Sequence, residues 1–118
     1  MDAKPTPPAL YYDGACPVCA KEVALYQKQE GACQIQWVDV TRCAESDLGA
    51  GLNRQDALQQ LHFRHSNGEL ISGVAAFAAL WQTLPRWAWA GRLLACRPVL
   101  WLAEPAYQLF LKVRKLWR

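Results

Sequence analysis

The 118-residue sequence lacks a strong charge bias, a periodic arrangement of glycine or proline, and any internal repeat. Charged residues make up only 19% and apolar residues 53%, and this balance excludes a disordered acidic or basic chain. Seven glycines and seven prolines without a period exclude collagen-like and linker-like chains. A chain of this length buries roughly two thirds of the surface that its unfolded form exposes. We therefore expect one folded domain.

The N-terminal segment also lacks the apolar stretch of a secretory signal peptide. Residues 1–9 contain Asp2, Lys4 and three prolines. Five cysteines are an odd number, which does not suit a fully paired extracellular disulfide framework. These observations predict a cytoplasmic protein with reduced thiols, in which cysteines outside a motif are small buried hydrophobic residues.

The first 40 residues predict a β-α-β unit. Residues 9–12 are apolar and aromatic and run into a turn signal, which favours a strand. Residues 17–30 have a helical pattern that starts at a proline and ends before a glycine. Residues 34–40 favour a second strand, which should be parallel to the first because such connections are right-handed. The apolar face of the helix contains Cys19, Val23 and Tyr26.

The next 44 residues predict a partly helical crossover, a hairpin and a helix. Helix-like stretches occur at residues 44–48 and 54–61. Asn67-Gly68 stands between two strand-like runs, and this dipeptide favours a type I′ turn, which needs positive φ at both positions. A helix should follow Gly73, with Val74, Phe77, Ala78 and Trp81 on one apolar face.

Together these elements predict an α/β fold, a thioredoxin-like βαβ-ββα sandwich over residues 1–84. Residues 85–118 should form a C-terminal helical extension packed on the same domain. Three prolines are expected to divide this extension into helical pieces: Pro85, Pro98 and Pro105. The last piece should have an apolar face made of Ala106, Leu109, Phe110, Val113 and Trp117.

Basic charge and tryptophan are concentrated in the last third of the chain. Residues 1–83 hold six Lys/Arg and nine Asp/Glu, a net charge of −3, whereas residues 84–118 hold seven Lys/Arg and one acid, a net charge of +6. We mainly expect an added helical layer with solvated arginines, and secondly peripheral contact with the inner face of a membrane. No nucleic-acid partner is expected, because no recognition motif accompanies the basic residues. A transmembrane span is interrupted by Arg92, Arg97, Pro98 and Glu104.

The segment Asp13-Gly14-Ala15-Cys16-Pro17-Val18-Cys19 carries the chemistry. Residues three apart on a helix are neighbours, so Cys16 and Cys19 lie within reach of a disulfide. Cys16 falls at the N-terminus of the expected helix, where unpaired N–H groups and the helix dipole favour a thiolate. Cys19 lies one turn further, where we expect it to be more buried and protonated.

These positions predict a thiol–disulfide oxidoreductase of the protein-disulfide reductase type. Cys16 would attack a partner's disulfide, and Cys19 would then resolve the mixed disulfide. The partner would be a protein or a low-molecular-weight thiol or disulfide, and the cysteine pair would need no cofactor. Asp13 is a candidate for proton exchange with the thiols, with an Asx turn or capping of the helix as the alternative role. The residues expected to support the motif are Gly14, Pro17 and Asp39.

The alternatives are a cysteine-ligated metal-binding module and a membrane-associated interaction module without redox turnover. Cys33 and Cys43 would complete the spacing C-x2-C-x13-C-x9-C, but structural zinc sites usually have two tight ligand pairs. His62 and His65 fall on a predicted strand and would point to opposite faces. We therefore expect no metal ligands, and we expect the leftover cysteines to be packing thiols: Cys33, Cys43 and Cys96.

The segment from Leu10 to Cys19 resembles the signature of the DCC family of thiol–disulfide oxidoreductase-like proteins, named for the motif Asp-x-x-Cys-x-x-Cys. Weaker similarity continues through Asp39, Asn67-Gly68, Gly73-x-x-Ala76-Phe77 and the end rich in tryptophan and arginine. The resemblance implies a thioredoxin-like fold and a redox role. Thioredoxins place a cis-proline before the hairpin strand, whereas residues 59–62 contain no proline. This departure bears on how a partner's backbone would be held.

Overall fold

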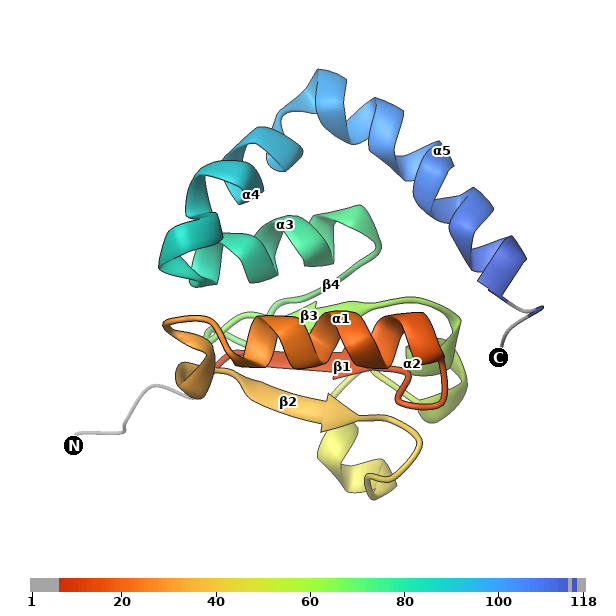
Figure 1. Ribbon diagram of the computed structural model, residues 1–118. Coiled ribbons are helices and arrows are strands. Elements are labelled where there is room, and N and C mark those ends of the chain that lie inside the picture. The colour runs from red at the N-terminus through yellow and green to blue at the C-terminus, as the bar shows by residue number, and fades with distance from the viewer. Residues whose placement is uncertain (1–6, 115, 117–118) are drawn as a thin grey trace.

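A computed structural model describes residues 7–114 and 116 (Figure 1). Its four strands form one mixed sheet in the order β2-β1-β3-β4. β1 pairs in parallel with β2 and antiparallel with β3, and β3 pairs antiparallel with β4. The strands are β1 (Ala9–Tyr12), β2 (Gln36–Asp39), β3 (His62–Arg64) and β4 (Leu70–Ser72). The helices are α1 (Pro17–Gln27), α2 (Arg54–Gln59), α3 (Val74–Thr83), α4 (Ala88–Ala95) and α5 (Arg97–Arg114).

The sheet is covered on both faces, as the expected thioredoxin-like sandwich requires. Successive residues of a strand point to opposite faces, and Leu10 and Tyr11 of β1 accordingly belong to two separate apolar clusters. Leu10 packs with residues of α1 and α3, whereas Tyr11 packs with the polar crossover and α2. Full burial of one such large side chain contributes about 1.5–3 kcal/mol. The α/β fold is therefore confirmed.

The boundaries differ from expectation between α1 and β2. Helix α1 ends at Gln27, three residues early, and a short 3-10 helix occupies Ala32–Gln34, where the second strand was expected to begin. Gly31 precedes this turn with φ of 88°, a left-handed conformation that glycine adopts without steric cost. The indole of Trp37 fixes the turn by donating a hydrogen bond to the Ala32 carbonyl at 2.9 Å.

The β3–β4 hairpin is present, but the type I′ prediction is wrong. Gly68 has φ of 95°, and no non-glycine residue in the described ranges has positive φ, so Asn67 does not adopt the required conformation. The His65 carbonyl accepts from Gly68 N–H at 2.9 Å, and His65 N–H donates to the Glu69 carbonyl at 2.8 Å. This is a three-residue loop with a left-handed glycine. Asn67 Oδ1 accepts from Glu69 N–H, a local bond that competes with the tighter turn.

Residues 85–114 form two helices that fold back over the sandwich (Figure 1). A 3-10 helix at Pro85–Trp87 leads into α4, which packs closely on α3: a Cβ on Gly91 would lie 2.7 Å from the Ala78 carbonyl oxygen. Helix α5 then runs toward the end of the sandwich where α1 begins. The placement of a domain boundary at residue 84 stays a prediction.

Pro105 does not divide the extension, because α5 continues through it. A proline within a helix removes one backbone hydrogen bond, and contacts on either side of Pro105 compensate for this loss. On one side, Glu104 Oε1 accepts from Val74 N–H at 3.0 Å and caps α3. On the other, Tyr107 packs edge-on against Phe77, with ring centroids 5.5 Å apart.

The expected apolar face of α5 is correct only in part, because Phe110 and Val113 are half-buried as expected. Ala106 and Leu109 are exposed, whereas Tyr107 and Arg114 face the sandwich. Trp117 lies outside the described residues. The large apolar side chains exposed on the last two helices and just beyond α5 are Trp89, Leu93, Trp101, Leu102, Leu109 and Leu116, which we call the outer surface of α4 and α5. Within the described ranges, no helix is long and apolar enough to span a membrane.

Candidate active site

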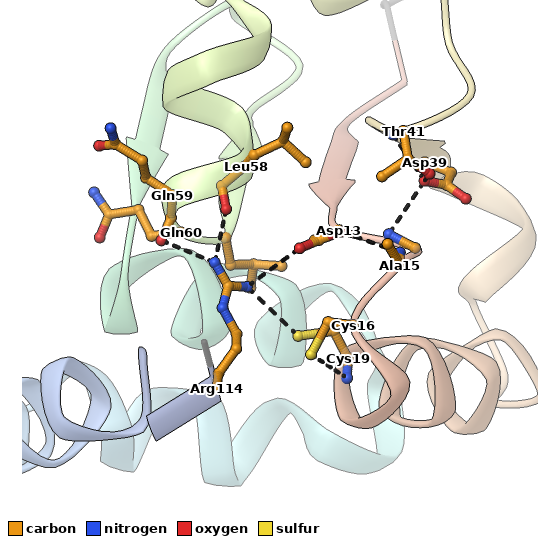
Figure 2. Close-up of polar contacts among 12 residues, drawn as sticks. Asp13, Ala15, Cys16, Cys19, Asp39, Thr41, Leu58, Gln59, Gln60 and Arg114 are labelled. Carbon is orange, nitrogen blue, oxygen red and sulfur yellow. Dashed lines mark hydrogen bonds and ion pairs between the residues drawn. The ribbon is translucent and has the colours of Figure 1, made fainter. Parts of the chain in front are cut away.

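The cysteine motif lies in the turn between β1 and α1 (Figure 2). Cys16 is the N-cap residue of α1, and Pro17 is its first helical residue, as expected. Cys16 Sγ accepts from Cys19 N–H at 3.4 Å, so the two residues are directly linked. The turn is closed by Cys16 N–H, which donates to the Asp13 carbonyl at 3.2 Å, and all five cysteines are free thiols.

The relative burial of the two cysteines is the reverse of the expectation. Cys16 is fully buried and Cys19 is partly exposed. The reason is local: Cys16 Sγ turns back over the first turn of α1, whereas Cys19 lines a hollow between α1 and α5. The hollow has about 30 Å³ of space, which is room for water.

Burial nevertheless disfavours the charged form of Cys19. Burial, together with the hydrogen bond with Cys16, raises the pKa of the Cys19 thiol to about 12, although the guanidinium of Arg114 acts to lower it. Cys19 is therefore protonated at neutral pH. The thiolate form of Cys16, expected from its place at the helix N-terminus, stays a prediction.

Asp13 and Asp39 have different surroundings in the site. Asp13 is buried, and its Oδ1 accepts from Ala15 N–H at 3.0 Å, so it forms the Asx turn that was its alternative role. Asp39 Oδ1 accepts from Gly14 N–H at 3.1 Å and from both the N–H and the hydroxyl of Thr41. Asp39 thus holds the backbone of the motif at the end of β2.

The sequence did not identify Arg114, which α5 brings to the cysteine pair across 95 residues of chain. We expected solvated arginines in the C-terminal third, and for Arg114 this is wrong because its side chain is buried. Its Nη1 lies 3.8 Å from Cys19 Sγ and 3.9 Å from Asp13 Oδ2. Its Nη2 donates to the carbonyls of Leu58 and Gln59 at 2.7 and 3.1 Å, as Figure 2 shows. The single signal in the sequence was its spacing of seven residues from Tyr107, which also faces the site.

The segment before β3 differs from thioredoxins in the way its backbone is bound. No cis peptide bond occurs among the described residues. The carbonyls of Leu58 and Gln59 accept from Arg114, and Leu61 N–H donates to the hydroxyl of Tyr107 at 2.9 Å. Two side chains of α5 therefore form hydrogen bonds with backbone groups of the segment before β3, which lies beside the cysteine pair.

The remaining cysteines and histidines lie elsewhere. Cys33 and Cys96 are exposed, so the expectation that they are packing thiols is wrong: the 3-10 turn and the α4–α5 junction leave both at the surface. Cys43 is half-buried near the Val40 carbonyl. His62 is buried beside the Gln60 carbonyl, and burial lowers its pKa. Among the described residues, no three His, Cys, Asp or Glu side chains are grouped so that they could hold a metal ion.

Comparison with known proteins supports the interpretation of the motif. The family model of DCC1-like thiol-disulfide oxidoreductases matches residues 10–118. A protein of Arabidopsis thaliana, described as uncharacterized and chloroplastic, is 30% identical over 107 residues, which are 89% of this chain and 50% of that protein. The chain thus spans about half the length of this relative, and no solved structure gives a significant match. The matched range contains the sheet, the cysteine pair and α5, and the chain belongs to the DCC1-like thiol-disulfide oxidoreductase family.

Proposed function

We propose that the protein catalyses thiol–disulfide exchange with Cys16 as the nucleophile and Cys19 as the resolving thiol. The observation that carries this proposal is the direct contact of the two residues, in which Cys16 Sγ accepts from Cys19 N–H at the start of α1. Donors at a helix N-terminus favour a thiolate on Cys16. Burial keeps Cys19 protonated until the second step.

In the first step the Cys16 thiolate attacks one sulfur of a partner disulfide, forming a mixed disulfide and releasing the other sulfur as a thiolate. Cys19 then loses its proton to water and attacks Cys16 Sγ. The Cys16–Cys19 bond forms, the bond to the partner breaks, and the second partner sulfur leaves as a thiolate. The protein has lost two electrons and the partner has gained them, and the reverse sequence oxidises a dithiol.

Asp13 is the proposed group for proton exchange near the pair. Its carboxylate is buried and lies 3.9 Å from Arg114 Nη1, which itself contacts Cys19 Sγ. Asp13 and Cys19 also line the same hollow, which supports a role for the carboxylate in relaying a proton between Cys19 and water during exchange. The proposed partner is a protein or a low-molecular-weight disulfide in the cytoplasm, and the reaction needs no cofactor beyond the cysteine pair.

Trapping of mixed disulfides tests the two roles. A Cys19→Ser variant should accumulate mixed disulfides in cells, because the resolving thiol is absent, whereas a Cys16→Ser variant should form none through this site. Cys33→Ser is the matched control, since Cys33 is exposed and lies outside the motif. Adducts that depend on Cys33 and persist without Cys16 would contradict the proposal. The captured proteins would identify the partner.

We propose in addition that the outer surface of α4 and α5 contacts a membrane with anionic lipids. Its exposed tryptophans, Trp89 and Trp101, suit the boundary between headgroups and acyl chains. Net charge supports an anionic surface, because the last 35 residues carry a charge of +6. The exposed basic side chains on the same two helices include Arg92, Arg97 and Lys112.

Co-sedimentation with lipid vesicles tests this contact. The full-length protein should sediment with vesicles containing phosphatidylserine, less so at high salt, and not with neutral vesicles. Trp101→Glu should reduce binding, whereas Leu25→Glu, which changes an exposed leucine of α1, should not. Equal binding of the two variants would contradict the proposed surface.

A further inference from the structure

Arg114 is a buried cation at the place where the proposed reaction forms anions. Its side chain is only 8% exposed, and burial of an arginine is costly unless acceptors surround the guanidinium. Two backbone carbonyls, of Leu58 and Gln59, accept from Nη2. The remaining contacts of the guanidinium run from Nη1 to a carboxylate and to a thiol sulfur.

If Arg114 served only to attach α5 to the domain, this would explain the two hydrogen bonds of Nη2 but not the contacts of Nη1. The two carbonyl bonds and the hydroxyl of Tyr107 on Leu61 N–H already attach α5 to the segment before β3. Nη1 is directed toward the redox pair instead, 3.8 Å from Cys19 Sγ. A neutral thiol is a weak acceptor, whereas a thiolate is a strong one for a guanidinium.

We propose that Arg114 is a residue of the redox centre, where its guanidinium stabilises the thiolate of Cys19 during disulfide exchange. This inference rests on the roles proposed for Cys16 and Cys19. The carbonyls that accept from Nη2 fix the orientation of the guanidinium. Nη1 therefore faces Cys19 Sγ before the reaction begins, and the side chain does not have to be ordered during it. Arg114 therefore supplies a fixed positive charge at an atom that becomes negative only during the reaction.

The charges around the hollow single out Arg114 for this role. The titratable residues that line the hollow with Cys19 are Tyr12, Asp13, Glu22, Tyr107 and Arg114, which come from the β1 end, α1 and α5. Among the described lining residues Arg114 is the sole cation, and the two acids oppose an anion on Cys19. Loss of the arginine would leave the Cys19 thiolate facing carboxylates without a compensating charge.

The consequence concerns the resolving step. Cys19 gives its proton to water, its thiolate attacks Cys16 Sγ, and the partner sulfur leaves as a thiolate that takes a proton from water. Stabilising the Cys19 thiolate raises the fraction of protein that can attack at a given pH. The equilibrium between the reduced pair and the disulfide should change little, because reduced Cys19 is protonated at neutral pH.

Neutral replacements of Arg114 test the proposal in protein that retains only Cys16 and Cys19. In Arg114→Gln, thiolate formation followed by ultraviolet absorbance should shift to higher pH, and resolution of a preformed glutathione adduct should slow about tenfold at pH 8. The equilibrium with glutathione at pH 8 should stay nearly unchanged, because reduced Cys19 is protonated there with or without the arginine. Arg114→Met is a second neutral variant that keeps the stem, and Arg114→Lys should restore part of each effect.

Glu104→Ala is the matched control for helix docking. It removes the contact between α5 and Val74 N–H but leaves Arg114 and the cysteine pair unchanged. Thiolate titration and resolution rate should therefore equal those of the parent protein. Unchanged titration and resolution in the folded neutral variants would overturn the role of Arg114. A parent protein that exchanges no disulfides would instead contradict the proposed function, while the titration would still decide on Arg114.

Discussion

Gly14 lies directly against the carboxylate of Asp39, and a Cβ at position 14 would overlap the Asp39 carboxyl group. Gly14 N–H donates to Asp39 Oδ1 at 3.1 Å, so the backbone of the cysteine motif is bound to the end of β2. The same oxygen accepts from the N–H and the hydroxyl of Thr41. Gly14 and Asp39, which were both expected to support the motif, are thus joined by one close contact.

Substitution of Gly14 by alanine should destabilise the fold by about 1–3 kcal/mol, the usual cost of overpacking a close contact. Urea denaturation measures the change in the free energy of unfolding. Asp39→Ala removes the obstructing carboxylate, so the double variant should lose less stability than the sum of the two single variants. Strict additivity would contradict the contact.

Stability should fall as the pH rises from about 9 toward about 12. The folded state raises the pKa of Cys19 from 9.0 to about 12. Below pH 9 the Cys19 thiol is protonated in both the folded and the unfolded state, and its contribution to the free energy of unfolding is complete. Above pH 9 the thiol ionises first in the unfolded chain, and this contribution is lost progressively. Urea midpoints between pH 8 and 11 should decline less in Cys19→Ser. The burial of Tyr107, whose pKa rises to about 12, should leave a residual slope in that variant.

Removal of the carboxylate of Glu104 should destabilise the protein by about 1 kcal/mol, the typical value for a helix cap. Gly73, the residue before α3, has no side chain to cap the helix, and Glu104 Oε1 accepts from Val74 N–H instead. Thermal unfolding of Glu104→Ala checks this value. Glu69→Ala, an exposed acid of the hairpin, is the control and should have little effect.

Thiol-modifying reagents should distinguish the five cysteines by their burial. In the native reduced protein, Cys33 and Cys96 should react first with a bulky maleimide, Cys19 more slowly and Cys16 last, because Cys16 is fully buried. Mass spectrometry of peptides after timed quenching gives the order. Rapid labelling of Cys16 before Cys33 would contradict the burial of Cys16 in the turn between β1 and α1.

The local elements of the fold followed from sequence because their signals are short-range. β1 and the N-terminus of α1 lie where the apolar run and Pro17 placed them. The hairpin was found but its turn type was not, since Asn67 bonds locally to Glu69 N–H rather than adopting positive φ. The expectation for Pro105 failed because distant contacts of Glu104 and Tyr107 hold α5 together.

The candidate site was predictable only in its first half. The spacing of Cys16 and Cys19 identified the redox pair, but the surroundings of Cys19 include α5, which no local pattern places beside it. Arg114 belongs to a basic stretch whose usual place is solvent, and only the docked helix makes it a neighbour of Cys19. Periodicity identified Phe110 on the docked face of α5 but missed Tyr107 and Arg114, because a tyrosine and an arginine do not mark an apolar face.

The order in which the parts of the redox centre come together follows from the sequence separation of 95 between Cys19 and Arg114. Contacts between segments so far apart in the sequence form late in folding, because closing the long loop between them costs conformational entropy. During synthesis the N-terminal part of a chain emerges and folds first. A nascent chain therefore exposes its cysteine pair before the helix that covers it exists, and the guanidinium beside Cys19 arrives as the last part of the redox centre.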